Sequence, residues 1–423
     1  MITRGFTWVH LEFEKLEPVG HRGPMASRTA SCVVADPACK KSVFWGVDGA
    51  KAAFSNAKTC WSHIDESLPQ IKDSKFQPQD IEAMVSRLVT LITEQLFLAD
   101  VVIYAPMPEP VALLATAIAV DRCLVFAGER NRQLFVCVRV GMPDELACAH
   151  GVKISSVLRH LSANRSGSPW LITAETPGIA QHLGDFLGFD VSVQPAALPS
   201  ILSAKRRYFQ GSPQPARISY LGEARQEKGF QYLPEIFRGF VTQRCSFRAL
   251  VHAYSNSENQ SADMDTARTQ LAELAAQLPK ESKLVVLQTA ISDTSYLNTL
   301  LTTDIVLMPY AEAAYRGRGS GVLDECLGAG ISVLLNHNSE LYSDYCDHPQ
   351  VFALDLLNPR ESIAWVMNKT TVAAKGAVVN PFWAPIGVKR ETNFGQPVAD
   401  ALQWQRPLGE CKDWAAVATL FEE

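Results

Sequence analysis

The sequence predicts an α/β protein built from two doubly wound, Rossmann-like domains that face a cleft. Two observations predict this fold. Short runs of β-branched and aromatic residues alternate along the whole chain with longer stretches of helical periodicity, which is typical of parallel sheets. The chain also has 423 residues, of which 47% are hydrophobic, so it can fill the cores of two domains.

The first domain is expected over residues 1–205. Its predicted strands are mostly apolar runs of the kind that a parallel sheet buries on both faces. They are residues 6–13, 42–47, 101–105, 122–126, 134–138, 171–174 and 191–194. Its predicted helices begin at prolines, which suit the first helical position, and comprise residues 24–35, 78–98, 110–119 and 177–187.

A stretch with four prolines, around residues 195–215, is poor material for a sheet and marks the domain boundary. The second domain is expected over residues 206–395, with the same alternation. Its predicted strands are residues 218–221, 246–252, 283–287, 305–308 and 331–335, and its predicted helices are residues 232–242, 264–276, 295–302 and 321–327. Residues 396–423 are expected to hold a last helix, about 412–421, that packs back toward the first domain.

Composition and charge argue against several classes of protein. The formal net charge is -5, so the basic surface that dominates nucleic-acid affinity is not expected. No uncharged apolar run reaches about 18 residues, and the N-terminus lacks the pattern of a signal peptide. A cytoplasmic protein without a transmembrane segment is therefore expected, and its ten scattered cysteines are interpreted as free thiols.

The first phosphate-binding candidate follows the predicted strand 218–221. It begins at Gly222 and continues with Arg225, Lys228 and Gly229 before a helix. An arginine fork and a lysine charge can hold a diphosphate, and glycine lets a ligand approach the backbone closely. The alternative is that Arg225 and Lys228 are ordinary solvated loop charges.

The second candidate is the loop after the predicted strand 305–308. It includes Arg318, Gly319, Ser320 and Gly321, and it opens a helix that carries Glu325. Backbone N–H groups at a helix N-terminus bind anions, and a carboxylate on the first turns can accept hydrogen bonds from ribose hydroxyls. The alternative for Glu325 is a surface or capping glutamate.

Together these segments resemble the donor domain of retaining nucleotide-sugar glycosyltransferases of the GT-B fold, similar to family 4. The resemblance covers about residues 216–358. It implies that Arg225 and Lys228 hold the donor diphosphate, that Ser320 and Gly321 add backbone donors, and that Glu325 binds the ribose. It also implies transfer with retention of configuration, without a metal or another cofactor.

The chain departs from the family pattern at two positions. Glu223 stands where the family usually has an arginine, so Arg225 is assigned by its chemistry. Gly317 stands where the family has the first glutamate of a pair, which affects recognition of the donor hexose. Tyr315 and Arg318, with the Ser-Gly that follows, fit a Tyr-x-x-Arg-x-Ser-Gly version of the loop.

The first domain offers fewer candidates. A glycine-bearing loop with His21 and Arg22 opens its first helix and resembles the loop that faces the cleft in such enzymes. His21 is the acceptor-side catalytic candidate, although a plain helix-opening turn explains it too. Arg139, after the strand 134–138, occupies a place where relatives often have a histidine, with a structural role as the alternative.

The resemblance implies a nucleoside-diphosphate sugar as donor and a glycan, lipid-linked or other acceptor, with peripheral membrane contact as an option. The pathway expected by analogy is polysaccharide biosynthesis. Two other readings stay open. One is a non-catalytic sugar-nucleotide-binding or scaffold protein with a decayed site, which Glu223 and Gly317 favour. The other is a sugar-nucleotide epimerase, for which the sequence shows no cluster of acids and bases.

Overall fold

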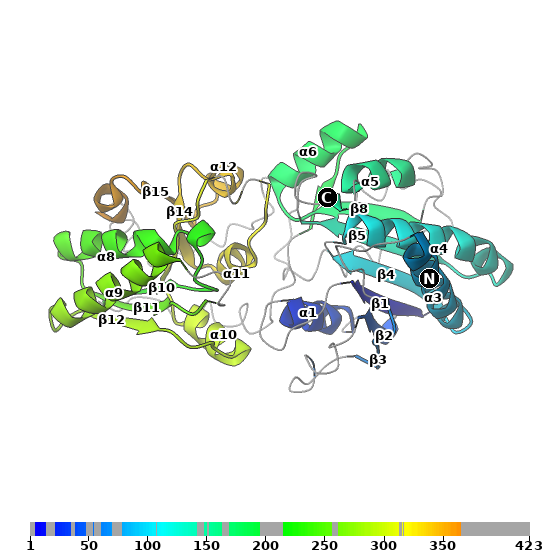
Figure 1. Ribbon diagram of the computed structural model, residues 1–423, viewed down its shortest axis with the longest axis horizontal. Helices are drawn as coiled ribbons and strands as arrows, with labels where there is room; N and C mark the ends of the chain where they lie inside the picture. Colours follow the sequence, from blue (N-terminus) through cyan, green and yellow to red (C-terminus); the bar gives the residue numbers. More distant parts are fainter. Residues whose placement is uncertain are drawn as a thin grey trace. The chain divides into compact units, whose positions relative to one another are not determined.

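The computed structural model describes residues 5–13, 22–34, 39–47, 54, 61–69, 78–106, 108–141, 148–149, 152–162, 169–194, 215–255, 261–312, 315 and 317–364. These residues belong to two compact units (Figure 1). The described residues before residue 198 form the first unit, and those after residue 199 form the second. Each unit is an α/β domain with one large parallel sheet, so the predicted fold class is confirmed for both. The predicted last helix lies outside the described residues.

The first unit has a seven-stranded parallel sheet in the order β3-β2-β1-β4-β5-β8-β9. Its strands are β1 (Phe6–Glu12), β2 (Cys39–Gly46), β3 (His63–Asp65), β4 (Asp100–Pro106), β5 (Leu134–Val140), β8 (Trp170–Ala174) and β9 (Ser192–Val193). Two short strands, β6 (Cys148–Ala149) and β7 (Val152–Lys153), form a separate antiparallel pair. Its helices are α1 (Arg22–Val34), α3 (Pro78–Leu96), α4 (Pro110–Glu129), α5 (Ile154–Ser162) and α6 (Pro177–Leu187).

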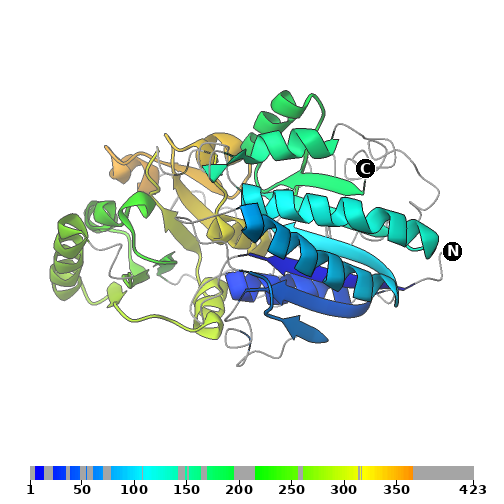
Figure 2. The same ribbon diagram turned by 45° about the vertical axis from the view of Figure 1, so that its right-hand side comes forward.

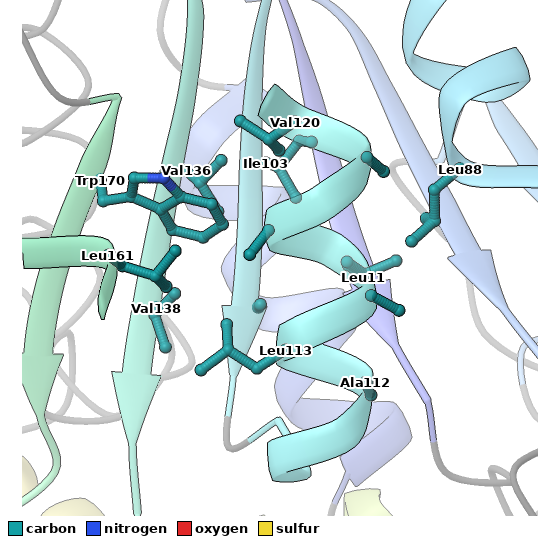
Figure 3. Close-up of a cluster of buried hydrophobic side chains, with 14 of the residues drawn as sticks. Leu11, Leu88, Ile103, Ala112, Leu113, Val120, Val136, Val138, Leu161 and Trp170 are labelled. Atoms are coloured by element: carbon teal, nitrogen blue, oxygen red, sulfur yellow. The ribbon is translucent and has the colours of Figure 1, made fainter. Parts of the chain in front are cut away.

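Helices α3 and α4 run side by side over one face of this sheet (Figure 2). Leu113 and Val120 of α4 point toward Ile103 and Val138 of the sheet, and all four side chains are buried (Figure 3). Helix α1 packs on the opposite face, where Val33 belongs to a cluster with strand residues of β1 and β4. The long apolar strands are thus covered on both faces, as their sequences predicted.

One prediction for this unit is wrong. The sequence predicted a helix ending at residue 119 and a strand over residues 122–126, but α4 continues to Glu129. Val120, Cys123 and Ala127 are all buried, and their spacing places them on one face of a continuous helix. Among the described helices, α4 is long and apolar enough to cross a membrane, although 56% of that stretch is buried inside the unit.

The second unit has a six-stranded parallel sheet in the order β12-β11-β10-β13-β14-β15. Its strands are β10 (Ala216–Tyr220), β11 (Phe247–His252), β12 (Lys283–Leu287), β13 (Ile305–Met308), β14 (Ser332–Asn336) and β15 (Val351–Leu354). Its helices are η1 (Gln226–Lys228), η2 (Phe230–Tyr232), α8 (Leu233–Thr242), α9 (Ala262–Gln277), α10 (Asp293–Leu301), α11 (Gly321–Ala329) and α12 (Glu340–Tyr345). All predicted strands and helices of this unit are confirmed, whereas β15 and α12 were not predicted.

The core of the second unit lies between its sheet and helices α8 and α9. Phe237 and Phe240 of α8 pack against Phe247 of β11, with ring centroids 5.6–5.7 Å from Phe247. The strand order places the first strand, β10, in the middle, with connections running to both sides. The reversal between β10 and β13 is the topological switch point, where open α/β sheets bind ligands.

Candidate functional site

Both candidate phosphate segments leave the sheet of the second unit at this switch point. β10 and β13 are neighbouring parallel strands, so their carboxyl ends lie at the same edge. The chain after β10 contains Gly222, Arg225 and Lys228, and the chain after β13 leads to Ser320 and α11. Segments about 90 residues apart in sequence are therefore brought together at this edge of the sheet.

The two segments are in direct contact. Gly229 has a φ of 71°, and a Cβ atom there would lie 1.8 Å from the carbonyl oxygen of Pro309. The backbone N–H of Ala311 donates to the carbonyl of Glu227 at 2.9 Å. Only glycine fits this close approach, which explains the glycine that follows the lysine in the first segment.

The ammonium of Lys228 lies next to Gly222, close to the first turn of α11. Gly222 has a φ of 95°, and a Cβ atom there would lie 3.0 Å from Lys228 Nζ and 3.9 Å from a methyl group of Val322. Lys228 is 9% exposed, and burial lowers the pKa of its ammonium to about 8, with a smaller lowering from Arg225 and opposing effects of Glu223 and Glu227. Within the described parts of the chain, its ammonium makes no hydrogen bond or ion pair.

Helix α11 presents its N-terminus at this place. Ser320 is the N-cap: its hydroxyl accepts from the N–H of Leu323 at 3.4 Å, and its carbonyl accepts from the N–H of Asp324 at 3.0 Å. Within the helix, this leaves the N–H groups of Gly321 and Val322 without an acceptor. A buried ammonium and two helix N–H groups together are suited to bind an anion.

Aromatic side chains support the loop that leads to this helix. The rings of Tyr310 and Tyr315 stack with centroids 4.1 Å apart, and the Tyr310 hydroxyl lies 3.3 Å from Ser320 Oγ. The side-chain amide of Asn336 donates to the carbonyl of Tyr310 at 2.7 Å. Tyr315 is thus a buried support of the loop, and Gly319 lies in the loop itself, partly exposed.

The two arginines of the site share the carboxylate of Glu227, which no motif of the sequence marks as a site residue. Glu227 pairs with Arg225 at 2.8 Å and with Arg318 at 3.8 Å, and Glu223 lies 3.6 Å from Arg225. The arginine side chains are 30% and 34% exposed, so both remain accessible to a ligand. With Lys228, the cluster has an excess of one positive charge.

Glu325 is buried, with 7% exposure, in the helix that starts at this site. Its carboxylate accepts a hydrogen bond from the hydroxyl of Tyr296 on α10. Glu325, which the sequence predicted to bind the ribose, is therefore close to the anion site along the chain. Its carboxylate also has a partner inside the unit. Tyr296 was not a candidate because α10 comes almost 30 residues earlier in sequence.

Two further polar residues contact the site. The backbone N–H of Gly317 donates to the carboxylate of Glu340, the first residue of α12, at 2.8 Å. His252, the last residue of β11, has Nδ1 2.8 Å from the carbonyl oxygen of Gly222 and Nε2 3.2 Å from that of Thr289. Burial lowers the pKa of His252. The position of His252 at the carboxyl end of a strand was the one signal that could have identified it.

In the first unit, His21 lies outside the described residues, so its predicted role stays a prediction. Arg139 is fully buried: its guanidinium pairs with Glu175 at 3.1 Å, and its Nε donates to the carbonyl of Gln194 at 2.6 Å. These contacts support the structural alternative for Arg139. In the described ranges of both units, no group of three or more His, Cys, Asp or Glu side chains could hold a metal ion.

No family model matches the chain, and no curated protein sequence matches it. Solved structures share its fold. One is a glycosyltransferase from Rickettsia africae, with 11% identity and a TM-score of 0.55 over 98% of this chain and 96% of that one. A UDP-forming α,α-trehalose-phosphate synthase from Burkholderia xenovorans has 12% identity and a TM-score of 0.55 over 96% and 99%.

The lipopolysaccharide outer core galactosyltransferase WaaB has 12% identity and a TM-score of 0.57, over 94% of this chain and 99% of that chain. At these identities the likeness concerns the fold. The chain therefore has the two Rossmann-like domains of the GT-B glycosyltransferase structures to which it is similar.

Proposed function

We propose that the protein is a glycosyltransferase that moves a sugar from a nucleoside-diphosphate sugar to an acceptor hydroxyl. The observation that carries the proposal is Lys228. A buried ammonium at the switch point, beside the N-terminus of α11 and without a partner among the described residues, is costly unless a ligand supplies an anion. A diphosphate fits this site because it can contact both the ammonium and the helix N–H groups.

The remaining residues have roles that follow from their positions. Arg225 and Arg318 extend the cationic surface beyond Lys228 and reach the outer oxygens of the diphosphate. Gly222 permits close approach of the ligand to the backbone. The segment Gly319-Ser320-Gly321 forms the start of α11, where the helix N–H groups meet the ligand. The ring of Tyr315 supports this segment. Glu325 binds hydroxyl groups of the ribose.

The chemistry needs stabilisation of the leaving group more than it needs a covalent catalyst. The bond between the anomeric carbon and the diphosphate breaks, the acceptor oxygen bonds to that carbon, and the proton of the acceptor hydroxyl passes to an oxygen of the departing diphosphate. Negative charge develops on the departing nucleoside diphosphate, where Lys228, the arginines and the helix N–H groups stabilise it. Loss of one such donor costs on the order of 3 kcal/mol, or about two decades in rate.

The finer assignments rest on the resemblance to family 4. They are retention of configuration, transfer without a metal ion, and a glycan or lipid-linked acceptor of a polysaccharide pathway on the cytoplasmic side of the membrane. His21 is proposed as the acceptor-side residue. UDP is the first nucleotide to test, because one of the structurally similar proteins is described as UDP-forming.

The test is a titration of the wild-type protein with UDP, GDP and ADP and with their sugar derivatives, followed by thermal shift and calorimetry. We expect one nucleoside diphosphate to bind and the affinity to be lost in Lys228→Met. Lys283→Met, which changes an exposed lysine at the start of β12, is the matched control and keeps the affinity. Failure of a folded wild-type protein to bind any of these ligands overturns the proposal.

Turnover separates the proposed enzyme from a sugar-nucleotide-binding protein. Release of nucleoside diphosphate from the bound sugar nucleotide, measured with and without candidate acceptors, is expected for the wild type. Binding without release under any acceptor condition would favour the non-catalytic alternative.

A further inference from the structure

His252 lies between two backbone carbonyl groups at the ligand-binding edge of the second unit. It is the last residue of β11, and it is 6% exposed. Its Nδ1 lies 2.8 Å from the carbonyl oxygen of Gly222, after β10, and its Nε2 lies 3.2 Å from that of Thr289, after β12. The imidazole therefore joins the two chain segments that follow the neighbours of β11 in the sheet.

This geometry suits a ring that carries two protons. A carbonyl oxygen only accepts hydrogen bonds, and a neutral imidazole has one N–H group, so the neutral ring can donate to one of the two oxygens but not to both. Its other nitrogen then directs a lone pair toward a carbonyl oxygen, in a place that is largely removed from water. An imidazolium has an N–H group on each nitrogen and donates to both oxygens.

The surroundings of the ring determine which form is present. Burial is the largest influence and lowers the pKa of His252, the two carbonyl groups raise it, the charge of Lys228 lowers it and that of Glu223 raises it. The ring of Tyr254 stacks on the imidazole, with centroids 6.0 Å apart. The net shift is downward, so the neutral form predominates at pH 7 in the ligand-free protein. A diphosphate beside Lys228 opposes the charge of that ammonium and thereby raises the pKa of His252.

We propose that His252 is a positioning residue of the anion site, which takes up a proton when a nucleoside diphosphate binds and then holds the segments after β10 and β12 together. This inference rests on the proposed function. His252 does not touch the nucleotide in this arrangement: it acts through Gly222, which lies next to the Lys228 ammonium. The proton comes from solvent, and this N–H bond is the one covalent bond that forms.

The coupling between the nucleotide and the proton has a defined sign. Because the bound nucleotide raises the pKa of His252, the protein with the protonated ring binds the nucleotide more tightly, and the affinity rises as the pH falls from about 7 to about 5.5. The Lys228 ammonium has a pKa of about 8, so it stays charged in this range and does not cause the change. Protonation of the nucleotide itself affects the wild type and a variant alike.

The test counts protons in the full-length protein. UDP, GDP and ADP are titrated into the wild type by calorimetry at about pH 6, in buffers of different ionisation enthalpy, which gives the protons taken up per bound nucleotide. The nucleotide that binds most tightly is then titrated into His252→Gln, whose amide cannot take up a proton in this range. His182→Gln, which changes an exposed histidine of α6, is the matched control.

We expect the wild type and the control to take up about 0.3 proton or more per nucleotide beyond the uptake of His252→Gln. The affinity of the wild type relative to this variant is expected to rise about threefold or more from about pH 7 to about pH 5.5. A merely structural role of His252 would change the affinity equally at both pH values and would not alter the proton uptake.

Equal proton uptake by the wild type and His252→Gln overturns the inference, and so does a ratio of affinities that is independent of pH. His252→Asn, which also lacks a titratable ring, replaces the Gln variant if that protein does not fold. Failure of the wild type to bind any of the three nucleotides would instead overturn the proposed function, so the two failures are distinguishable.

Discussion

Replacing Lys228 by methionine is expected to stabilise the protein while it removes the affinity for nucleoside diphosphates. Burial lowers the pKa of the Lys228 ammonium from 10.5 to about 8, so the folded protein holds this proton less tightly than the unfolded chain does. At about 1.4 kcal/mol for each pKa unit, keeping the group charged at pH 7 costs the folded state about 3 kcal/mol. Methionine has a similar length and no charge, so it removes this cost.

The stabilisation has a characteristic pH dependence. Between pH 8 and 10.5, the lysine is protonated in the unfolded chain and neutral in the folded protein, so the stability of the wild type rises with pH in this window. The advantage of Lys228→Met is therefore complete below about pH 8 and disappears toward pH 10.5.

Urea denaturation followed by circular dichroism, at about pH 7 and about pH 10, measures both effects. Lys283→Met is the control and is expected to unfold like the wild type, because its lysine is exposed. A Lys228→Met variant that unfolds at a lower urea concentration than the wild type at neutral pH would refute the reasoning. It would mean that the ammonium has a stabilising partner in the folded protein.

Three other predictions follow from the same site. Binding of a nucleoside diphosphate by the wild type is expected to weaken above about pH 8, as Lys228 loses its charge, and calorimetry across that range measures it; an affinity independent of pH contradicts the role of the ammonium. Gly229→Ala is expected to cost at least about 2 kcal/mol more than Gly188→Ala, measured by urea denaturation. Both glycines have a positive φ, of 71° and 74°, but only a Cβ at Gly229 would collide with a backbone oxygen, so equal costs would contradict the described contact. Glu227→Gln is expected to strengthen diphosphate binding about threefold or more at low ionic strength and less in high salt, because a carboxylate leaves the anion site. The control Glu235→Gln, on an exposed ion pair of α8, is expected to leave the affinity unchanged, and weaker binding by Glu227→Gln would show that this carboxylate orients the arginines instead.

Hydrophobic patterning was sufficient to predict most of the fold. Strands of a parallel sheet are apolar along their whole length, so runs such as β5 and β13 were identified almost to the residue. Continuous apolar sequence also explains the error in α4. This helix is apolar on nearly all sides, so a short run of its residues has the same pattern as a buried strand. The three-residue strand β3 and the six-residue helix α12 are too short to carry a periodic signal.

The candidate site was predictable where the backbone dictates the residue. Gly222 and Gly229 have positive φ values, and Ser320 caps a helix, and each of these requirements restricts the residue type locally. Partners that come from elsewhere in the chain were not predictable. The carboxylate of Glu340 at Gly317, and the phenol of Tyr296, reach the site only because the strand order brings their elements to one edge.

The position of β10 inside its sheet has a consequence for synthesis of the protein. β10 is the first strand of its unit to leave the ribosome, but one of its two edges is completed only by β13. Just before β13, the side-chain carboxylate of Asp304 accepts from the N–H of Arg217, 87 residues earlier in the chain. At translation rates of about 5–20 residues per second, that edge stays open for roughly 4–17 s. An open strand edge is a template for pairing with other chains. The strand order itself, rather than any one residue, therefore makes this unit a candidate for chaperone assistance while it is being synthesised.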